Sequence, residues 1–228
     1  MRYVAFLFLL ISITGYSQAL SKEELLGQFD PSTHPDFVRI DSKYTSKHNI
    51  YLRQEVYEAY ERMYEEAWKA GINLQILSAT RNFDYQRGIW ERKWDRPRYM
   101  GWQDIDKAVD IMTYSSMPGT SRHHWGTDID LCSLSNDWFA SAEGARVYDW
   151  LNLNAWKYGF RQVYSNKEIT GRTGYNEEKW HWSYMPLSSV FLDQYNALVL
   201  EEDIEGFPGS EVAGEIGVIT DYVNGVED

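Results

Sequence analysis

The chain has 228 residues, of which 43% are hydrophobic and 16% aromatic, and its formal net charge is −12. This composition predicts one folded domain, or at most two small ones, and excludes an intrinsically disordered chain. The acidity also excludes a general basic surface for nucleic acid or for an anionic membrane.

The first nineteen residues have the pattern of a signal peptide. Arg2 precedes an apolar run over residues 4–13, and Ser17 and Ala19 are the small residues expected before a cleavage site. The run is too short to span a bilayer comfortably, and the alternative is a buried N-terminal strand or helix. We therefore expect a secreted protein with a periplasmic location. Its lone cysteine, Cys132, permits no intrachain disulfide and is expected to be buried and structural.

Hydrophobic periodicity and turn residues outline the elements in chain order. Helices are predicted over residues 51–70, 83–94, 105–112, 142–158, 188–200 and 210–223. Strands are predicted over residues 74–80, 127–131, 160–164 and 179–184. For the first helix, Asn49 is the expected N-cap and Gly71 the expected stop.

These elements predict an α+β fold in which helices pack against a small sheet. The first part of the mature chain, residues 20–50, is irregular and is expected to pack on the domain as an extended segment. Residues 51–200 form the predicted core, and residues 201–228 an acidic, helical C-terminal segment. No internal repeat and no clear interdomain linker interrupts this plan.

Two short stretches concentrate residues that bind metals. Residues 121–130 contain two histidines and two aspartates, and His181 follows in a second stretch. His123 and Asp130 are seven residues apart with Gly126 between them, so the chain can turn and direct both side chains at one ion. With His181 they make a nitrogen and oxygen donor set that suits Zn²⁺ better than Mg²⁺ or Ca²⁺. We therefore predict a zinc site with one position left for water.

Two further residues can supply chemistry next to that site. Glu178 lies three residues before His181, so it can take a proton from the attacking water without being a ligand. Arg81 follows a predicted strand at its carboxyl end and can hold a substrate carboxylate or a developing oxyanion.

The simpler interpretation treats each residue as structural: a hydrogen-bonded His–Asp pair, a core His181 between two tryptophans, and Arg81 in a surface ion pair. Their joint occurrence favours the metal site. The chain has no His-Glu-x-x-His helix, so the common metalloprotease motif does not apply.

The two stretches resemble the signatures of the D-alanyl-D-alanine carboxypeptidase family, the VanY-like zinc peptidases. The matching patterns are Ser121-x-His-x-x-Gly-x-x-x-Asp130 and Glu178-x-Trp-His181, and Ser78-Ala-Thr-Arg81-Asn-Phe-Asp-Tyr-Gln86 resembles a third family segment. The resemblance covers residues 74–184. It implies a small antiparallel sheet of the type shared with the hedgehog N-terminal domain and lysostaphin-type peptidases.

The resemblance also implies roles for these residues in hydrolysing peptidoglycan stem peptides. His123, Asp130 and His181 would bind zinc, Glu178 would be the catalytic base, and Arg81 would stabilise the scissile carbonyl or the terminal carboxylate. Ser121 and Gln86 would contact the substrate peptide. Cleavage of a D,D-bond, an L,D-bond or an internal bond remains open, and the alternative is a non-catalytic zinc module that binds wall peptides or a protein partner.

The chain departs from the family pattern at two positions. Asp128 stands where the family usually has alanine; it could orient a ligand histidine or compete with Asp130 as the ligand, and we favour Asp130. His124 is an additional histidine, which we expect in the pocket or on the surface. As a fourth ligand it would close the site and indicate a structural zinc.

Overall fold

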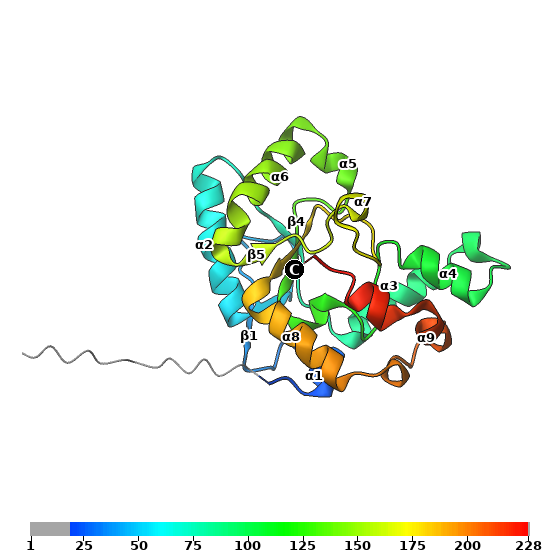
Figure 1. Cartoon of the computed structure of the whole chain (residues 1–228). Coiled ribbons are helices and arrows are strands. Elements are labelled where there is room, and N and C mark those ends of the chain that lie inside the picture. Colours follow the sequence, from blue (N-terminus) through cyan, green and yellow to red (C-terminus); the bar gives the residue numbers. More distant parts are fainter. Residues whose placement is uncertain (1–18, 228) are drawn as a thin grey trace, which may run out of the picture.

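The computed structural model describes residues 19–227, so nearly all of the expected signal peptide lies outside the described residues. Strands lie at its centre, with helices around them (Figure 1). Four of these strands form an antiparallel sheet of order β3-β4-β6-β5. The strands are β3 (Ile76–Ser78), β4 (Asp128–Leu131), β6 (His181–Tyr184) and β5 (Phe160–Arg161). The predicted α+β class with a small antiparallel sheet is confirmed.

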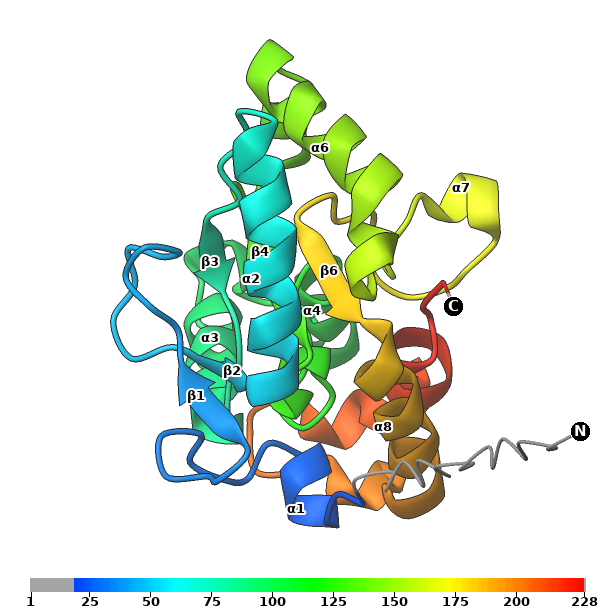
Figure 2. The same cartoon turned by 90° about the vertical axis from the view of Figure 1, so that its left-hand side faces the viewer.

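One face of this sheet is covered by α2 (Gln54–Lys69) and α6 (Ala142–Asn154) (Figure 2). Side chains alternate along a strand, so Ile129 and Leu131 of β4 point to this face together with Trp182 of β6. They pack against the apolar stripe of α2, which contains Val56, Ala59, Tyr60, Met63 and Ala67. This core fixes the sheet from behind and leaves its opposite face for polar side chains.

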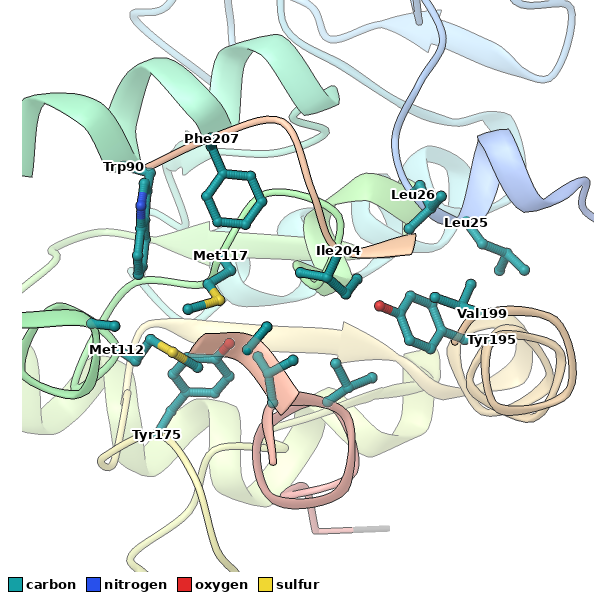
Figure 3. Packing of buried hydrophobic residues seen from close by; sticks show 14 of the residues in the cluster. Leu25, Leu26, Trp90, Met112, Met117, Tyr175, Tyr195, Val199, Ile204 and Phe207 are labelled. Carbon is teal, nitrogen blue, oxygen red and sulfur yellow. The ribbon is translucent and has the colours of Figure 1, made fainter. Parts of the chain in front are cut away.

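A second hydrophobic cluster joins α3 (Phe83–Trp94), α4 (Asp104–Ile111) and α8 (Met185–Leu198) to the C-terminal segment. Figure 3 shows Trp90 and Phe207 packed beside Met117 and Ile204, with Tyr175 reaching the same cluster. The indole of Trp90 also donates a 2.8 Å hydrogen bond to the Pro208 carbonyl. The C-terminal segment is therefore built into the core of the domain.

The prediction of one continuous helix over residues 210–223 is wrong. The structure has a 3₁₀ turn (Ser210–Val212), α9 (Ala213–Ile216) and a π-helical turn (Val218–Val223). Gly217, at φ 69°, separates the last two because a left-handed residue ends an α-helix. Apolar spacing alone could not reveal this break.

The N-terminal segment is more ordered than expected. It contains α1 (Lys22–Leu25) and β1 (Phe37–Arg39), which pairs antiparallel with β2 (Tyr51–Arg53). Residues 51–53 are therefore strand and not the first turn of the helix, and Asn49 has φ 55° and does not cap it. Gly71 at φ 73° follows the end of α2 as predicted.

The remaining helices are short and lie in the connections. They are α5 (Asn136–Phe139), α7 (Lys167–Thr170) and the 3₁₀ turns Pro97–Tyr99, Arg122–Trp125, Ala155–Tyr158 and Glu201–Asp203. Among the described residues, no helix combines the length and the apolar character needed to cross a bilayer.

Candidate metal centre and cleft

The polar face of the sheet brings the predicted metal ligands together. Asp130 on β4 is directly opposite His181 on β6, and His123 enters from the 3₁₀ turn before β4. The Asp130 Oδ1 atom lies 3.1 Å from His181 Nδ1 and 3.3 Å from His123 Nε2. One donor atom from each residue lies within 4.8 Å of the other two, which is the spacing of ligands around a single ion.

Gly126 produces the turn that makes this approach possible. It ends the 3₁₀ turn in the left-handed region, at φ 72°, and the chain then enters β4. A Cβ at this position would collide with the Phe37 ring, so the glycine is required by close packing as well as by its backbone angle. The turn expected between His123 and Asp130 is confirmed.

Hydrogen bonds within the fold orient both imidazoles. His123 Nδ1 donates to the Ala79 carbonyl at 2.8 Å, and His181 Nε2 donates to Asp128 Oδ1 at 2.9 Å. With those protons placed, His123 Nε2 and His181 Nδ1 carry the lone pairs that face Asp130. His123 Nε2 is buried and has no hydrogen-bond partner among the described residues. This orphaned atom, beside a carboxylate and a second imidazole, fits a zinc ion bound through two nitrogens and one oxygen.

The charges of the cluster also favour a cation. Burial alone would raise the pKa of Asp130, but His123 and His181 more than offset it and hold that pKa well below its usual range. Burial alone would lower the pKa of His181, yet hydrogen bonds to Asp128 and Asp130 raise it to about 9. Two buried carboxylates thus attract either a proton or a metal ion to the same place.

Asp128 supports His181 from behind and is itself held by buried groups. Its carboxylate accepts hydrogen bonds from the Ser183 hydroxyl and from Arg122 Nε, the latter at 3.3 Å. Arg122 and Asp128 are 2% and 0% exposed, so they form a buried ion pair behind the metal cluster. Asp128 therefore lies where a carboxylate that orients His181 would lie, and Asp130 lies between the two histidines, where a metal ligand would lie. Sequence reasoning missed Arg122, although its charge next to His123 was the available signal.

Glu178 is buried near the cluster without joining it. Its Oε2 atom lies 3.9 Å from His181 Nδ1. Burial, with the charge of Asp130 adding to it, raises the pKa of Glu178 to about 7. A carboxylate with a pKa near neutrality can both accept and return a proton.

A cavity of about 570 Å³ opens onto these residues. It is lined by the predicted residues Arg81, Ser121, His123, Asp130, Glu178 and His181, together with Ile89, Lys93, Tyr114, Ser115, Ser116, Leu134, Ser135, Asn136, Asp137, Tyr164, Tyr175 and Trp180. Gln86 does not line it. The Gln86 amide instead donates a 2.7 Å hydrogen bond to the Ser116 carbonyl and so supports one wall. Lys93 and Tyr175 in this lining were missed by the sequence analysis.

His124 fixes the position of Arg81. The backbone N–H of Arg81 donates to the His123 carbonyl at 3.1 Å, and its own carbonyl accepts a 2.6 Å hydrogen bond from His124 Nδ1. His124 Nε2 accepts the Gly119 N–H at 3.0 Å. Both ring nitrogens of His124 are thus occupied at a fully buried position, and this residue is neither a pocket residue nor a fourth ligand.

Two histidines and one aspartate that could hold a metal ion, in an open cleft with a buried glutamate beside them, are an arrangement typical of metal-dependent hydrolases. Comparison with known proteins narrows this class. Residues 49–187 match the family model described as VanY, D-alanyl-D-alanine carboxypeptidase. The chain belongs to this family, and the resemblance found in its motifs is confirmed.

Individual relatives agree with this placement. YodJ of Bacillus subtilis is 32% identical over 79% of this chain and 63% of its own length. A D-alanyl-D-alanine carboxypeptidase of Enterococcus faecalis is 27% identical over 61% of this chain and 50% of its own. The chain thus spans only between half and two thirds of these relatives.

Solved structures share the fold. The LD-carboxypeptidase LdcB superposes with a TM-score of 0.54 at 26% identity, covering 77% of this chain and 78% of that one. VanYB, solved with D-alanine-D-alanine, has a TM-score of 0.51 at 24% identity and covers 72% of this chain and 91% of its own.

Proposed function

We propose that this protein is a zinc carboxypeptidase that removes the C-terminal D-amino acid from peptidoglycan stem peptides. The observation that carries the proposal is the convergence of His123, Asp130 and His181, each oriented by the fold, at the floor of an open cavity. Relatives named D-alanyl-D-alanine carboxypeptidase support the substrate class. VanYB was solved with D-alanine-D-alanine, which supports a D,D-bond, and the LD-carboxypeptidase LdcB keeps an L,D-bond as the second candidate.

His123, Asp130 and His181 would hold the zinc, which when bound supplies Lewis-acid chemistry and allows water to attack at neutral pH. Glu178 accepts the proton of the attacking water, because its carboxylate is buried beside His181 with a pKa near neutrality. The same carboxylate then returns the proton to the departing amine. Positioned proton transfer of this kind contributes about 10²–10⁴ in rate.

Arg81 supplies positive charge to the lining of the cavity. Its Nε atom is buried and has no hydrogen-bond partner among residues 19–227, and its backbone N–H is bonded to the carbonyl of His123. Arg81 is therefore placed to stabilise the oxyanion that develops on the scissile carbonyl, or the terminal carboxylate. Ser121, whose buried hydroxyl also has no partner in that range and lines the cavity, is available to the peptide.

The test is digestion of purified muropeptides followed by mass spectrometry. We expect loss of one alanine from pentapeptides with the parent protein, whereas loss from tetrapeptides alone would indicate the L,D-specificity. Glu178→Gln should keep the metal and lose at least about a hundredfold in kcat. The matched control is Glu177→Gln, which changes a neighbouring glutamate that does not line the cavity. Equal turnover by Glu178→Gln and the parent would contradict the assigned base.

The expected signal peptide supports a secreted, periplasmic protein, and we propose that location for the activity because the peptide substrates lie outside the cytoplasm. Fractionation of cells that produce the full chain tests it. A product that retains residues 1–19 and stays in the cytoplasm would contradict this proposal.

A further inference from the structure

Lys93 is a cation in the cleft for which the proposed mechanism has no use. It lies one helical turn after Ile89 on α3, and both side chains line the cavity. Within residues 19–227 Lys93 forms no hydrogen bond and no ion pair, although its side chain is half-buried. A lysine in that position loses hydration without gaining a protein partner in return.

The groups around Lys93 leave its ammonium without a paired anion. Burial lowers the pKa of Lys93 to about 8, and the nearby cations of Arg96, Arg81 and Arg98 act in the same direction. Glu178 is the acid that opposes them. Asp137 also lines the cavity but forms no ion pair with Lys93. An anion that entered the cleft would restore the missing partner and favour the charged lysine.

Arg81 and Lys93 are two separate cations in the lining of the cavity. Arg81 affects the Glu178 carboxylate more strongly than Lys93 does, and it also depresses the pKa of the ligand His123. The backbone of Arg81 is hydrogen-bonded to that same histidine. Arg81 is thus tied to a candidate metal ligand through its backbone, whereas Lys93 reaches the same cavity from α3.

We propose that Lys93 is a carboxylate-binding residue for the substrate peptide, separate from Arg81. This inference rests on the proposed function, because it assigns the substrate's second anionic group to a place in the same cleft. A peptide can offer that carboxylate in two ways: at its C-terminus, or on the side chain of a residue before the cleaved bond. Lys93 would contact this carboxylate through a single charged group and not in a bidentate manner, because an ammonium acts as a point charge.

The test uses three peptides that end in D-alanyl-D-alanine. The first has a neutral side chain at the third residue and a free C-terminus, the second is its C-terminal amide, and the third carries diaminopimelate at the third residue. Binding to the zinc-loaded Glu178→Gln protein is measured by calorimetry, and kcat and KM are measured on the zinc-loaded protein with its native Glu178. Each measurement is repeated with Lys93→Met, Lys93→Arg and Arg92→Met.

Lys93→Met should lose about tenfold or more in affinity for one of the two carboxylates, and the loss should appear in KM more than in kcat. Loss of the preference for acid over amide identifies the C-terminus, and loss of the preference for diaminopimelate identifies the side chain. Lys93→Arg should restore the preference. Arg92→Met removes a neighbouring charge outside the cavity and should preserve both preferences. If Lys93→Met keeps both preferences, the inference is wrong.

Failure of the proposed function is distinguishable from failure of this inference. A parent protein that binds the acids through Lys93 but cleaves no peptide would refute the peptidase and leave the carboxylate site standing. A parent protein that cleaves the peptides with preferences independent of Lys93 would do the reverse.

Discussion

At the scale of single residues, the most informative feature is the buried pair of Arg122 and Asp128. Asp128 departs from the motif that the chain resembles, and its carboxylate accepts a hydrogen bond from His181, one of the three candidate ligands. The guanidinium of Arg122 offsets the negative charge of that carboxylate, and the Ser183 hydroxyl donates a hydrogen bond to it. The additional acid is therefore part of the support of the metal centre and comes with its own counter-charge.

We predict that Asp128→Ala lowers zinc affinity by about 10- to 100-fold, because His181 loses the partner that orients it. Competition with a chelating dye measures this directly. Asp106→Ala, on α4 and outside the cleft, is the control. Unchanged affinity in Asp128→Ala would show that the metal does not depend on this support.

The same pair allows a prediction about stability. Asp128→Ala leaves the Arg122 guanidinium buried without its partner, which costs about 3–5 kcal/mol. The double variant Arg122→Leu, Asp128→Ala should recover a large part of that loss. Urea unfolding of the two single variants and the double variant gives the coupling energy, and strict additivity would contradict a direct interaction.

At the scale of elements, the centre depends on the turn that joins the 3₁₀ segment to β4. Alternation along β4 and β6 separates an apolar face, which packs on α2, from a polar face that carries the ligands. His123 does not belong to this sheet and reaches it only because Gly126 reverses the chain.

We predict that Gly126→Ala destabilises the protein more than Gly71→Ala does. Gly126 has φ 72° and Gly71 has φ 73°, so alanine at either position costs the same backbone strain of about 1 kcal/mol or more. A Cβ at Gly71 meets nothing within 4 Å, whereas one at Gly126 collides with Phe37. Thermal unfolding of the two variants isolates the collision, and equal shifts in Tm would contradict it.

The helical elements were predictable where a local signal marks both ends, and less so elsewhere. The helix over Phe83–Trp94 was predicted at its observed bounds, with Arg96-Pro97 as the signal for its end, and the structure shows that the Asn82 side chain caps its start. The first turn predicted for α2 is strand, because pairing with β1 outweighs helical periodicity there. Such pairing depends on residues distant in sequence.

The candidate site shows the same division. Histidines and carboxylates in motif spacing identified the cluster, since their chemistry is rare in combination. The place of Lys93 in the cleft depends on which helix faces it, and the support given by His124 depends on what is buried behind it. Neither can be read from spacing.

At the scale of the whole molecule, the C-terminal segment holds one wall of the cleft. Tyr222 packs on Tyr175 with ring centroids 5.1 Å apart, and Tyr175 lines the cavity. The segment also contributes Phe207 to the cluster around Trp90. Residues after 200 therefore belong to the same cooperative unit as the metal centre.

We predict that Phe207→Ala lowers the free energy of unfolding by about 3–5 kcal/mol, because it leaves a cavity between α3 and the C-terminal segment. Leu200→Ala, at a position 53% exposed in the same segment, should cost far less. Urea unfolding compares them. Similar costs would show that the segment lies on the domain without sharing its core.

The hydrogen bonds from His123 to Ala79 and from His181 to Asp128 have a consequence for how the enzyme would acquire its ion. Many small zinc domains fold only around their metal, because nothing else holds the ligands in place. Here backbone and carboxylate partners perform that task in advance, and the cavity gives an ion a direct route from solvent. Zinc would then bind to and exchange from a protein that is already folded, so its uptake would depend on the free zinc around the protein and not on the course of folding.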